Sequence, residues 1–141
     1  MQRLAFGAID FQLDLNMRAG FDALIFFRSQ LVLASRLANI GAPIDSPSTA
    51  IDDVGDVDEV EAEAQRARHL GFGAKLCIHP EQIAAVNRSF GPSEAERAWA
   101  QRVIEIGAAS RGAAIALDGT MVDKPVILRA QAILRERRLV R

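Results

Sequence analysis

Short apolar runs alternate along most of this chain with longer stretches of helical periodicity. Leu4–Gly7 and Lys75–Ile78 are apolar runs of strand length, and Pro43–Asp45 is a shorter extended piece between them. Apolar residues recur at helical spacing in Gly20–Ile40 and Val57–Leu70. This alternation of strands and helices is typical of βα units, which build a parallel sheet.

Glycine and proline mark where these elements end. Gly41 and Gly71 are placed to end the two long helices as C′ glycines. After the last strand, Pro80 suits the first position of a further helix that runs to about Arg88. The N–H of the first helical residue has no hydrogen-bond partner within the helix, so proline, which lacks an N–H, is tolerated there.

The C-terminal third has a different pattern. Ser93 and Glu96 have the spacing of a capping box, which marks the start of a helix. Asp118-Gly119 stands between two short apolar runs and favours a type I′ hairpin turn. The pattern therefore predicts a helix over 93–110, a hairpin over 113–122 and a helix over 125–139.

Three parallel strands are too few for a closed barrel, and an open sheet of three strands would leave two bare edges. The chain also starts directly with a strand, as a fragment of a larger fold would. We therefore interpret residues 1–92 as the last three βα units, about strands six to eight, of a TIM (β/α)8 barrel. Residues 93–141 would form a C-terminal extension, and the fold class is α/β.

Composition and charge narrow the possible partners. The 141 residues are 50% hydrophobic and 25% charged, with a net charge of −1, so we expect neither nucleic-acid nor membrane partners. No apolar run approaches the roughly 20 residues of a membrane-spanning helix. The lone Cys77 rules out a disulfide framework and is expected to be a small buried residue rather than a nucleophile. We expect a reduced, cytoplasmic protein.

Two aspartates are candidates for chemistry. Asp10 stands just past the first strand, at the end of a barrel strand where active sites lie. Carboxylate oxygens suit Mg²⁺, but an Asp in this position also commonly caps a helix or a turn. Asp123, two residues before Pro125, is placed to cap the last helix.

Other polar residues are weaker candidates. Lys75 is placed to hold an anionic group or to pair with a carboxylate. His79 is a candidate for catalysis or metal binding, but we expect it rather to make structural hydrogen bonds at the strand end. Asp14 is expected to fix a loop or cap a turn. The basic C-terminal end is expected to be a solvated helix face that complements the helix dipole.

Four segments, taken in order, resemble the HpcH/HpaI aldolase and citrate lyase beta subunit superfamily. The last resembles the C-terminal motif of its CoA-thioester branch, which includes citrate lyase beta subunits, malyl-CoA lyases and citramalyl-CoA lyases. Each segment alone is a weak signal, and the shared order makes the resemblance specific. The segments are Leu4–Phe11 with Asp14-Leu15, Pro43–Asp45, Gly71–Gln82 and Asp118–Pro125.

The resemblance implies a (β/α)8 barrel with a protruding extension, assembled into homo-oligomers that are trimers or hexamers in relatives. It implies that Asp10 binds Mg²⁺ and that backbone N–H groups near Gly7 and Ala8 face the substrate carboxylate. Asp123 would reach a neighbouring subunit's site and handle a proton, a role that we expect to exclude capping of the last helix. Ile9 departs from the family, since many relatives have an acidic residue there.

The function implied by this resemblance is that of a Mg²⁺-dependent carbon–carbon lyase. It would cleave or form a 3-hydroxyacyl-CoA thioester such as malyl-, citramalyl- or citryl-CoA, with an acyl-CoA and a 2-oxo acid as the other partners. The family's substrate-binding Arg and its second metal ligand, a Glu, lie on earlier strands and have no counterpart here. Two alternatives remain: a catalytically incomplete fragment that serves at most as an interaction module, or a CoA-independent 2-oxo acid aldolase.

Overall fold

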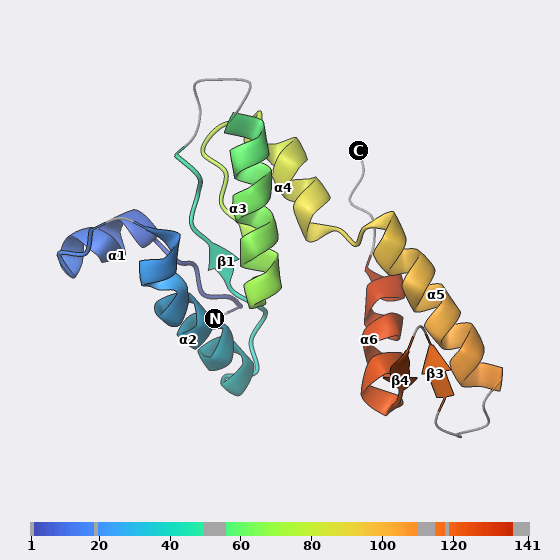
Figure 1. Cartoon of the computed structure of the whole chain (residues 1–141). Coiled ribbons are helices and arrows are strands. Elements are labelled where there is room, and N and C mark those ends of the chain that lie inside the picture. Colours follow the sequence, from blue (N-terminus) through green and yellow to red (C-terminus); the bar gives the residue numbers. More distant parts are fainter. Residues whose placement is uncertain (1, 19, 50–55, 110–114, 118, 137–141) are drawn as a thin grey trace. The chain divides into compact units, whose positions relative to one another are not determined.

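The computed structural model describes residues 2–18, 20–49, 56–109, 115–117 and 119–136. The chain divides into two compact units, Met1–Phe90 and Gly91–Arg141, and each is described by itself. Figure 1 shows the order of helices and strands along the chain. Both units mix helices with strands, as expected for an α/β chain.

A small parallel sheet lies at the centre of the first unit. Strand β1 (Ile44–Asp45) pairs in parallel with β2 (Ala74–Lys75) on one side. On its other side it pairs with Leu4–Phe6, where the Phe6 N–H donates to the Ile44 carbonyl at 2.9 Å. The three expected strands are therefore confirmed as parallel neighbours. They are shorter than expected, because the run over Lys75–Ile78 pairs as a strand only at its beginning.

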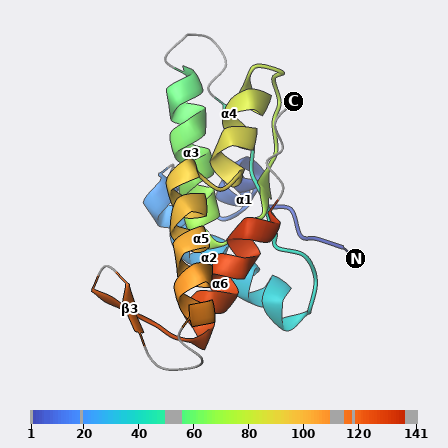
Figure 2. The ribbon, with the colours of Figure 1, turned by 90° about the vertical axis from the view of Figure 1, so that its right-hand side faces the viewer.

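Helices follow each of these strands. They are α1 (Ala8–Asp14), α2 (Phe21–Leu37), α3 (Asp56–Leu70) and α4 (Gln82–Phe90). Helix α1 occupies the segment that we expected to be a loop after the first strand. Figures 1 and 2 both show α3 beside α4, and these two helices share a buried cluster of Val60, Ala64, Ala85 and Val86.

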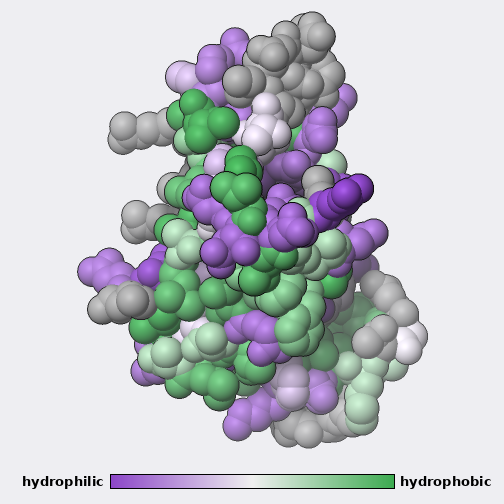
Figure 3. Space-filling model, turned by 90° about the vertical axis from the view of Figure 1, so that its left-hand side faces the viewer, coloured by the Kyte–Doolittle hydropathy of each residue, from purple (hydrophilic) through white to green (hydrophobic). Residues whose placement is uncertain are grey.

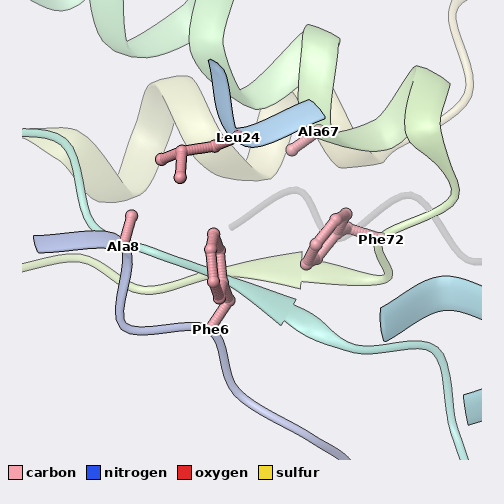
Figure 4. Close-up of a cluster of buried hydrophobic side chains, with 5 residues drawn as sticks. All are labelled: Phe6, Ala8, Leu24, Ala67 and Phe72. Carbon is pink, nitrogen blue, oxygen red and sulfur yellow. The ribbon is translucent and has the colours of Figure 1, made fainter. Parts of the chain in front are cut away.

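One face of the sheet packs against α2 and α3. Phe6 and Phe72 point from the sheet towards Leu24 of α2 and Ala67 of α3, and all four are buried (Figure 4). Phe72 lies before β2 and does not set its alternation. Within the paired residues side chains alternate between the two faces, so Ala5, Ile44 and Ala74 lie opposite Phe6, Asp45 and Lys75, and Leu76 follows on the same side as Ala74. Ala5 and Leu76 are exposed, and Ile44 and Ala74 are partly exposed. The sheet therefore has one buried face and one apolar face that remains accessible.

The ends of the helices confirm one glycine prediction and correct another. Gly71 ends α3 with φ of 100°, and the Phe72 N–H donates back to the Ala67 carbonyl, as in a Schellman motif. Gly41 does not end α2. Asn39 does so, with φ of 53°, because the helix stops earlier and Asn tolerates this left-handed conformation.

The start of α4 also differs from the prediction. Pro80 lies in a turn and not at the first helical position, since α4 begins at Gln82. The Gln82 side chain explains the shift: its Oε1 accepts hydrogen bonds from the Ile78 N–H at 3.0 Å and the His79 N–H at 3.4 Å. These bonds satisfy the backbone of the turn before the helix starts.

Large apolar side chains are exposed on α1 and α2. Figure 3 faces this side of the chain and shows hydrophobic side chains gathered between polar ones. The most exposed of them are Leu13 at 81%, Leu37 at 78% and Phe26 at 62%. Single exposed apolar residues are ordinary on a protein surface, and α1 and α2 carry several of them.

The second unit contains a helix, a hairpin and a helix, in the order predicted. Helix α5 spans Glu94–Ala109, strands β3 (Ile115–Leu117) and β4 (Thr120–Val122) pair antiparallel, and α6 spans Lys124–Arg135. Figure 2 shows α5 and α6 side by side. They enclose a cluster of buried residues: Ala100, Val103, Val122, Ala130 and Ile133.

Local signals in this unit are confirmed. The Glu96 N–H donates to Ser93 Oγ at 3.1 Å, and the Ser93 N–H donates to Glu96 Oε2 at 2.8 Å, which is a complete capping box. Gly119 has φ of 78°, as a hairpin turn of this kind requires, while Asp118 lies outside the described residues. Within the described part of the chain, none of the helices combines the length and the apolar character that crossing a membrane demands.

Candidate functional site

Asp10 lies in the first turn of α1, directly after the Leu4–Phe6 segment, and its side chain is exposed. It does not cap the helix, because the N-cap position belongs to Gly7 and no side chain makes a cap hydrogen bond there. A carboxylate in a first turn is favoured by the helix dipole. The structure thus places Asp10 where a strand ends, with its carboxylate open to solvent.

Gly7 and Ala8 form the start of the same helix. The Gly7 carbonyl accepts the first helical hydrogen bond, from the Phe11 N–H at 3.0 Å. The N–H groups of the residues before Phe11 therefore have no partner inside the helix. Donors of this kind suit a carboxylate ligand, and the Ala8 side chain is buried while Gly7 is exposed.

A buried ion network lies between the sheet and the helices, at the ends of β1 and β2. The Asp45 carboxylate has its Oδ1 3.0 Å from Arg28 Nε and its Oδ2 3.3 Å from Lys75 Nζ. Arg28 also donates from its Nη2 to Ser46 Oγ at 3.2 Å. The side chains of Arg28, Asp45 and Lys75 are 7%, 2% and 2% exposed. Asp45 thus joins helix α2 to both strands.

Lys75 extends the network to α3. Its Nζ lies 3.0 Å from Glu63 Oε2 and donates to the Ser46 carbonyl at 2.8 Å. Two cations, Arg28 and Lys75, face two carboxylates, Asp45 and Glu63, so the group of four is neutral. Of the two roles proposed for Lys75, the structure shows pairing with carboxylates.

Sequence reasoning missed Arg28 and Glu63. A signal for Arg28 was present: Leu24, Arg28, Leu31 and Ser35 recur at helical spacing, so the arginine stands on the buried stripe of α2. A charged residue on such a stripe predicts a buried partner. No comparable signal marks Glu63, which resembles the other acidic residues of its helix.

A pocket of about 240 Å³ opens beside this network. Residues from α1, α2, α3 and the strand ends line it, and they include Ala8, Ile9, Arg28, Asp45, Ser46 and Lys75. Asp10 is not among the lining residues. The pocket therefore connects the beginning of α1 with the ion network and leaves the Asp10 carboxylate outside it.

Asp123 is the N-cap of α6 in the second unit. Its Oδ1 accepts a hydrogen bond from the Val126 N–H at 3.1 Å, and the residue is exposed. We expected capping and proton transfer to exclude each other. The cap hydrogen bond uses one carboxylate oxygen, so this exclusion does not follow from the geometry.

The structure corrects the prediction that Cys77, two residues before His79, is buried. Cys77 is exposed and not buried, because the strand pairing stops before it. Partial burial of the thiol nevertheless raises the pKa of Cys77, and the nearby charge of Lys75 offsets part of this effect. His79 Nδ1 accepts a hydrogen bond from the Glu81 N–H at 3.4 Å, which is the structural role expected for it.

A metal site depends on how acidic, histidine and cysteine side chains are grouped in the fold. In the part that the structure describes, no three His, Cys, Asp or Glu side chains come together in a way that would hold one. Mg²⁺ commonly binds only one or two protein carboxylates, with water and substrate as the other ligands. Asp10 therefore fits such a site as a single carboxylate ligand.

Known proteins similar to this chain are found among lyases, although no family model matches it. The citrate lyase subunit beta-like protein of Deinococcus radiodurans is 39% identical over 134 residues, which cover 92% of this chain and 46% of that protein. The mitochondrial citramalyl-CoA lyase of Rattus norvegicus is 28% identical over 140 residues, which cover 95% of this chain and 40% of that protein.

The fold is similar to that of solved structures as well. The CitE protein of Mycobacterium tuberculosis, in complex with magnesium, acetoacetate and coenzyme A, matches with a TM-score of 0.76 and 34% identity. The match covers 93% of this chain and 50% of that one. The chain thus spans about half the length of the relatives it matches, or less. It is a homologue of the citrate lyase beta subunits and beta-like proteins, as its four segments indicated.

Proposed function

We propose that this chain forms part of a Mg²⁺-dependent carbon–carbon lyase that acts on a 3-hydroxyacyl-CoA thioester. The observation that carries the proposal is the position of Asp10, an exposed carboxylate that follows a parallel strand at the start of a helix. The similarity to a citramalyl-CoA lyase and to a CitE protein solved with magnesium and coenzyme A supports the choice of reaction.

The proposed fold is the last three βα units of a (β/α)8 barrel, over residues 1–92, followed by an extension over 93–141. Two features support it. The three strand segments are parallel neighbours, each followed by a helix. The face opposite Phe6 carries Ala5, Ile44, Ala74 and Leu76, which are exposed or partly exposed and are small or apolar side chains of the kind that fill a barrel interior.

Three parts of the chain have proposed roles in the site. Asp10 is the Mg²⁺ ligand, and the N–H groups near Gly7 and Ala8 bind the substrate carboxylate. Bound Mg²⁺ would polarise the substrate oxygen where negative charge develops during cleavage. Asp123, exposed at the start of α6, exchanges a proton with the acyl-CoA fragment bound at a neighbouring subunit's site. Carbon–carbon cleavage then yields a short acyl-CoA and a 2-oxo acid, in a homo-oligomer.

The assay for this proposal uses the 141-residue protein with Mg²⁺ and malyl-CoA, and it measures release of acetyl-CoA. We expect Mg²⁺-dependent turnover that falls by about 10²-fold or more in Asp10→Asn and in Asp123→Asn. Asn caps a helix as well as Asp does, so the Asp123 variant should keep its fold. Asp14→Asn, an exposed aspartate on α1, is the matched control.

The outcomes separate the alternatives. Turnover that survives Asp10→Asn would show that the metal assignment is wrong. If the chain binds Mg²⁺ but gives no turnover with any CoA thioester, it is a catalytically incomplete fragment and at most an interaction module. Turnover of a free 2-oxo acid aldol without CoA would instead indicate the CoA-independent aldolase.

A further inference from the structure

We propose that Arg28 is a positioning residue, which ties the buried Asp45–Lys75 pair to helix α1 and so fixes the place of the Asp10 carboxylate. The inference deepens the proposed function, since it concerns the residue proposed there as the metal ligand. It names a side chain outside the motifs that suggested this function. Contacts connect Asp45 through Arg28 and two phenylalanine rings to α1.

The first part of this connection is the buried end of Arg28. Its Nε lies 3.0 Å from Asp45 Oδ1, and its Nη2 lies 3.2 Å from Ser46 Oγ. Asp45 is held on its other oxygen by Lys75. A guanidinium with two hydrogen bonds in a fixed plane has little freedom to turn. The orientation of Arg28 is thus set by the ends of β1 and β2.

The second part is the face of the same guanidinium. Arg28 Cζ lies 5.3 Å from the centroid of the Phe6 ring, within the range of a cation–π contact. The planar arginine group can stack on an aromatic ring while its edge keeps hydrogen bonds, and a lysine cannot do both in this way. Phe6 is buried, so the contact is shielded from water.

The third part joins the rings to α1. The Phe6 and Phe11 centroids lie 5.3 Å apart and the Phe11 and Phe27 centroids 4.8 Å apart, both edge to face. Phe11 is the neighbour of Asp10 in α1, and Phe27 is the neighbour of Arg28 in α2. A helix of 7 residues is too short to be stable by itself. Its place therefore depends on this packing.

Loss of Arg28 should loosen α1 and weaken metal binding. The probe is Mn²⁺, which prefers the same oxygen ligands as Mg²⁺ and is followed by electron paramagnetic resonance. We expect Arg28→Met to weaken Mn²⁺ binding by about 10- to 100-fold, the range typical of residues that orient metal ligands. Arg28→Lys keeps the charge but not the planar contact, and should fall between Arg28→Met and the unaltered chain.

Amide hydrogen exchange supplies a readout that does not depend on metal. In Arg28→Met, exchange should become faster over residues 8–17 by a larger factor than over α4, which would not be so if the whole unit unfolded. Arg36→Met is the matched control, because Arg36 is an exposed arginine on the same helix. Phe11→Leu breaks the connection at the other end and should reproduce the effect on α1, with Leu13→Ala as its control.

Each outcome decides the proposal. Unchanged exchange over residues 8–17 in Arg28→Met would overturn it, whether or not Mn²⁺ binds. If Arg28→Met does not fold, Phe11→Leu and Arg28→Lys decide by the same readouts. If Asp10→Asn leaves Mn²⁺ binding unchanged, the proposed metal site fails, while the exchange rates still show whether Arg28 positions α1.

Discussion

The two units of this chain build their interiors differently. The second unit buries an apolar cluster in which α5 and α6 pack on each other and on Val122 of the hairpin. The first unit has an apolar cluster as well, around Phe6 and Phe72, but it also buries the charged side chains of Arg28, Asp45 and Lys75. The interior of the second unit therefore depends on apolar packing. The interior of the first unit depends on apolar packing and also on the balance of its buried charges.

The two interiors should therefore lose stability in different ways when a residue is substituted. An apolar cluster that loses a methyl group keeps its remaining contacts and partly relaxes around the cavity. A buried network of two cations and two carboxylates that loses one member is left with an unbalanced charge in a buried place. The positions at which a substitution does most damage should therefore lie in the first unit, at the ends of β1 and β2.

The largest effect is expected for Lys75→Met. It leaves Asp45, whose side chain is 2% exposed, with one cation instead of two, and should lower the free energy of unfolding by about 3–5 kcal/mol. Urea denaturation measures the loss. Leu76→Met is the matched control, since Leu76 follows Lys75 in the chain and its side chain points to the accessible face of the sheet. A loss below about 1 kcal/mol in Lys75→Met would show that the network contributes little.

A somewhat smaller effect is expected for Ile133→Ala in the second unit. Ile133 is 7% exposed and packs in the cluster between α5 and α6, so its truncation leaves a cavity. The expected loss in the free energy of unfolding is about 2–4 kcal/mol. Faster amide exchange in α5 and α6 would show that this loss of stability lies in the second unit. If Ile133→Ala were more damaging than Lys75→Met, the contrast between the two interiors would be wrong.

A smaller effect again is expected for Ser93→Ala. The substitution removes the Oγ that accepts the Glu96 N–H and opens the capping box of α5. The expected loss is about 1 kcal/mol, typical of an N-cap residue. Thermal unfolding followed by circular dichroism measures it. Ser93→Asp should restore most of the stability because Asp is an equally good cap, and failure of this rescue would point to another role for Ser93.

Features that depend on neighbours in the sequence were predictable. The capping box at Ser93, the hairpin over β3 and β4 and the Schellman ending of α3 at Gly71 all appear as expected. Each rests on residues within a few positions of one another, so the sequence contains the whole signal. The parallel order of the three strands was also predictable, because βα units leave few other arrangements.

Features that depend on residues far apart in the sequence were not predictable. The four members of the ion network stand at positions 28, 45, 63 and 75, and only their assembly explains why Lys75 is buried. Burial of Cys77 was predicted from an apolar run, but that segment lies beyond the paired part of β2 and is exposed. Asp10, Gly7, Ala8 and Asp123 stay predictions, since their proposed roles concern a metal and a substrate that the chain's own geometry does not test.

The smallest effect concerns the Cys77 thiol, which sits two residues beyond the network. Partial burial raises the pKa of Cys77 above its ordinary value, and the Lys75 charge opposes this. At any pH near neutral the folded chain thus has less thiolate than the unfolded chain, and alkylation by iodoacetamide should be slower in buffer than in urea.

The folded state also holds the proton of the Cys77 thiol more tightly than the unfolded state does. The resulting small stabilisation is present below the ordinary pKa of the thiol and disappears as the pH rises through its raised value. Rates measured from pH 7 to pH 10 check the prediction. Equal alkylation rates in buffer and in urea at every pH would mean that the folded chain does not perturb this thiol.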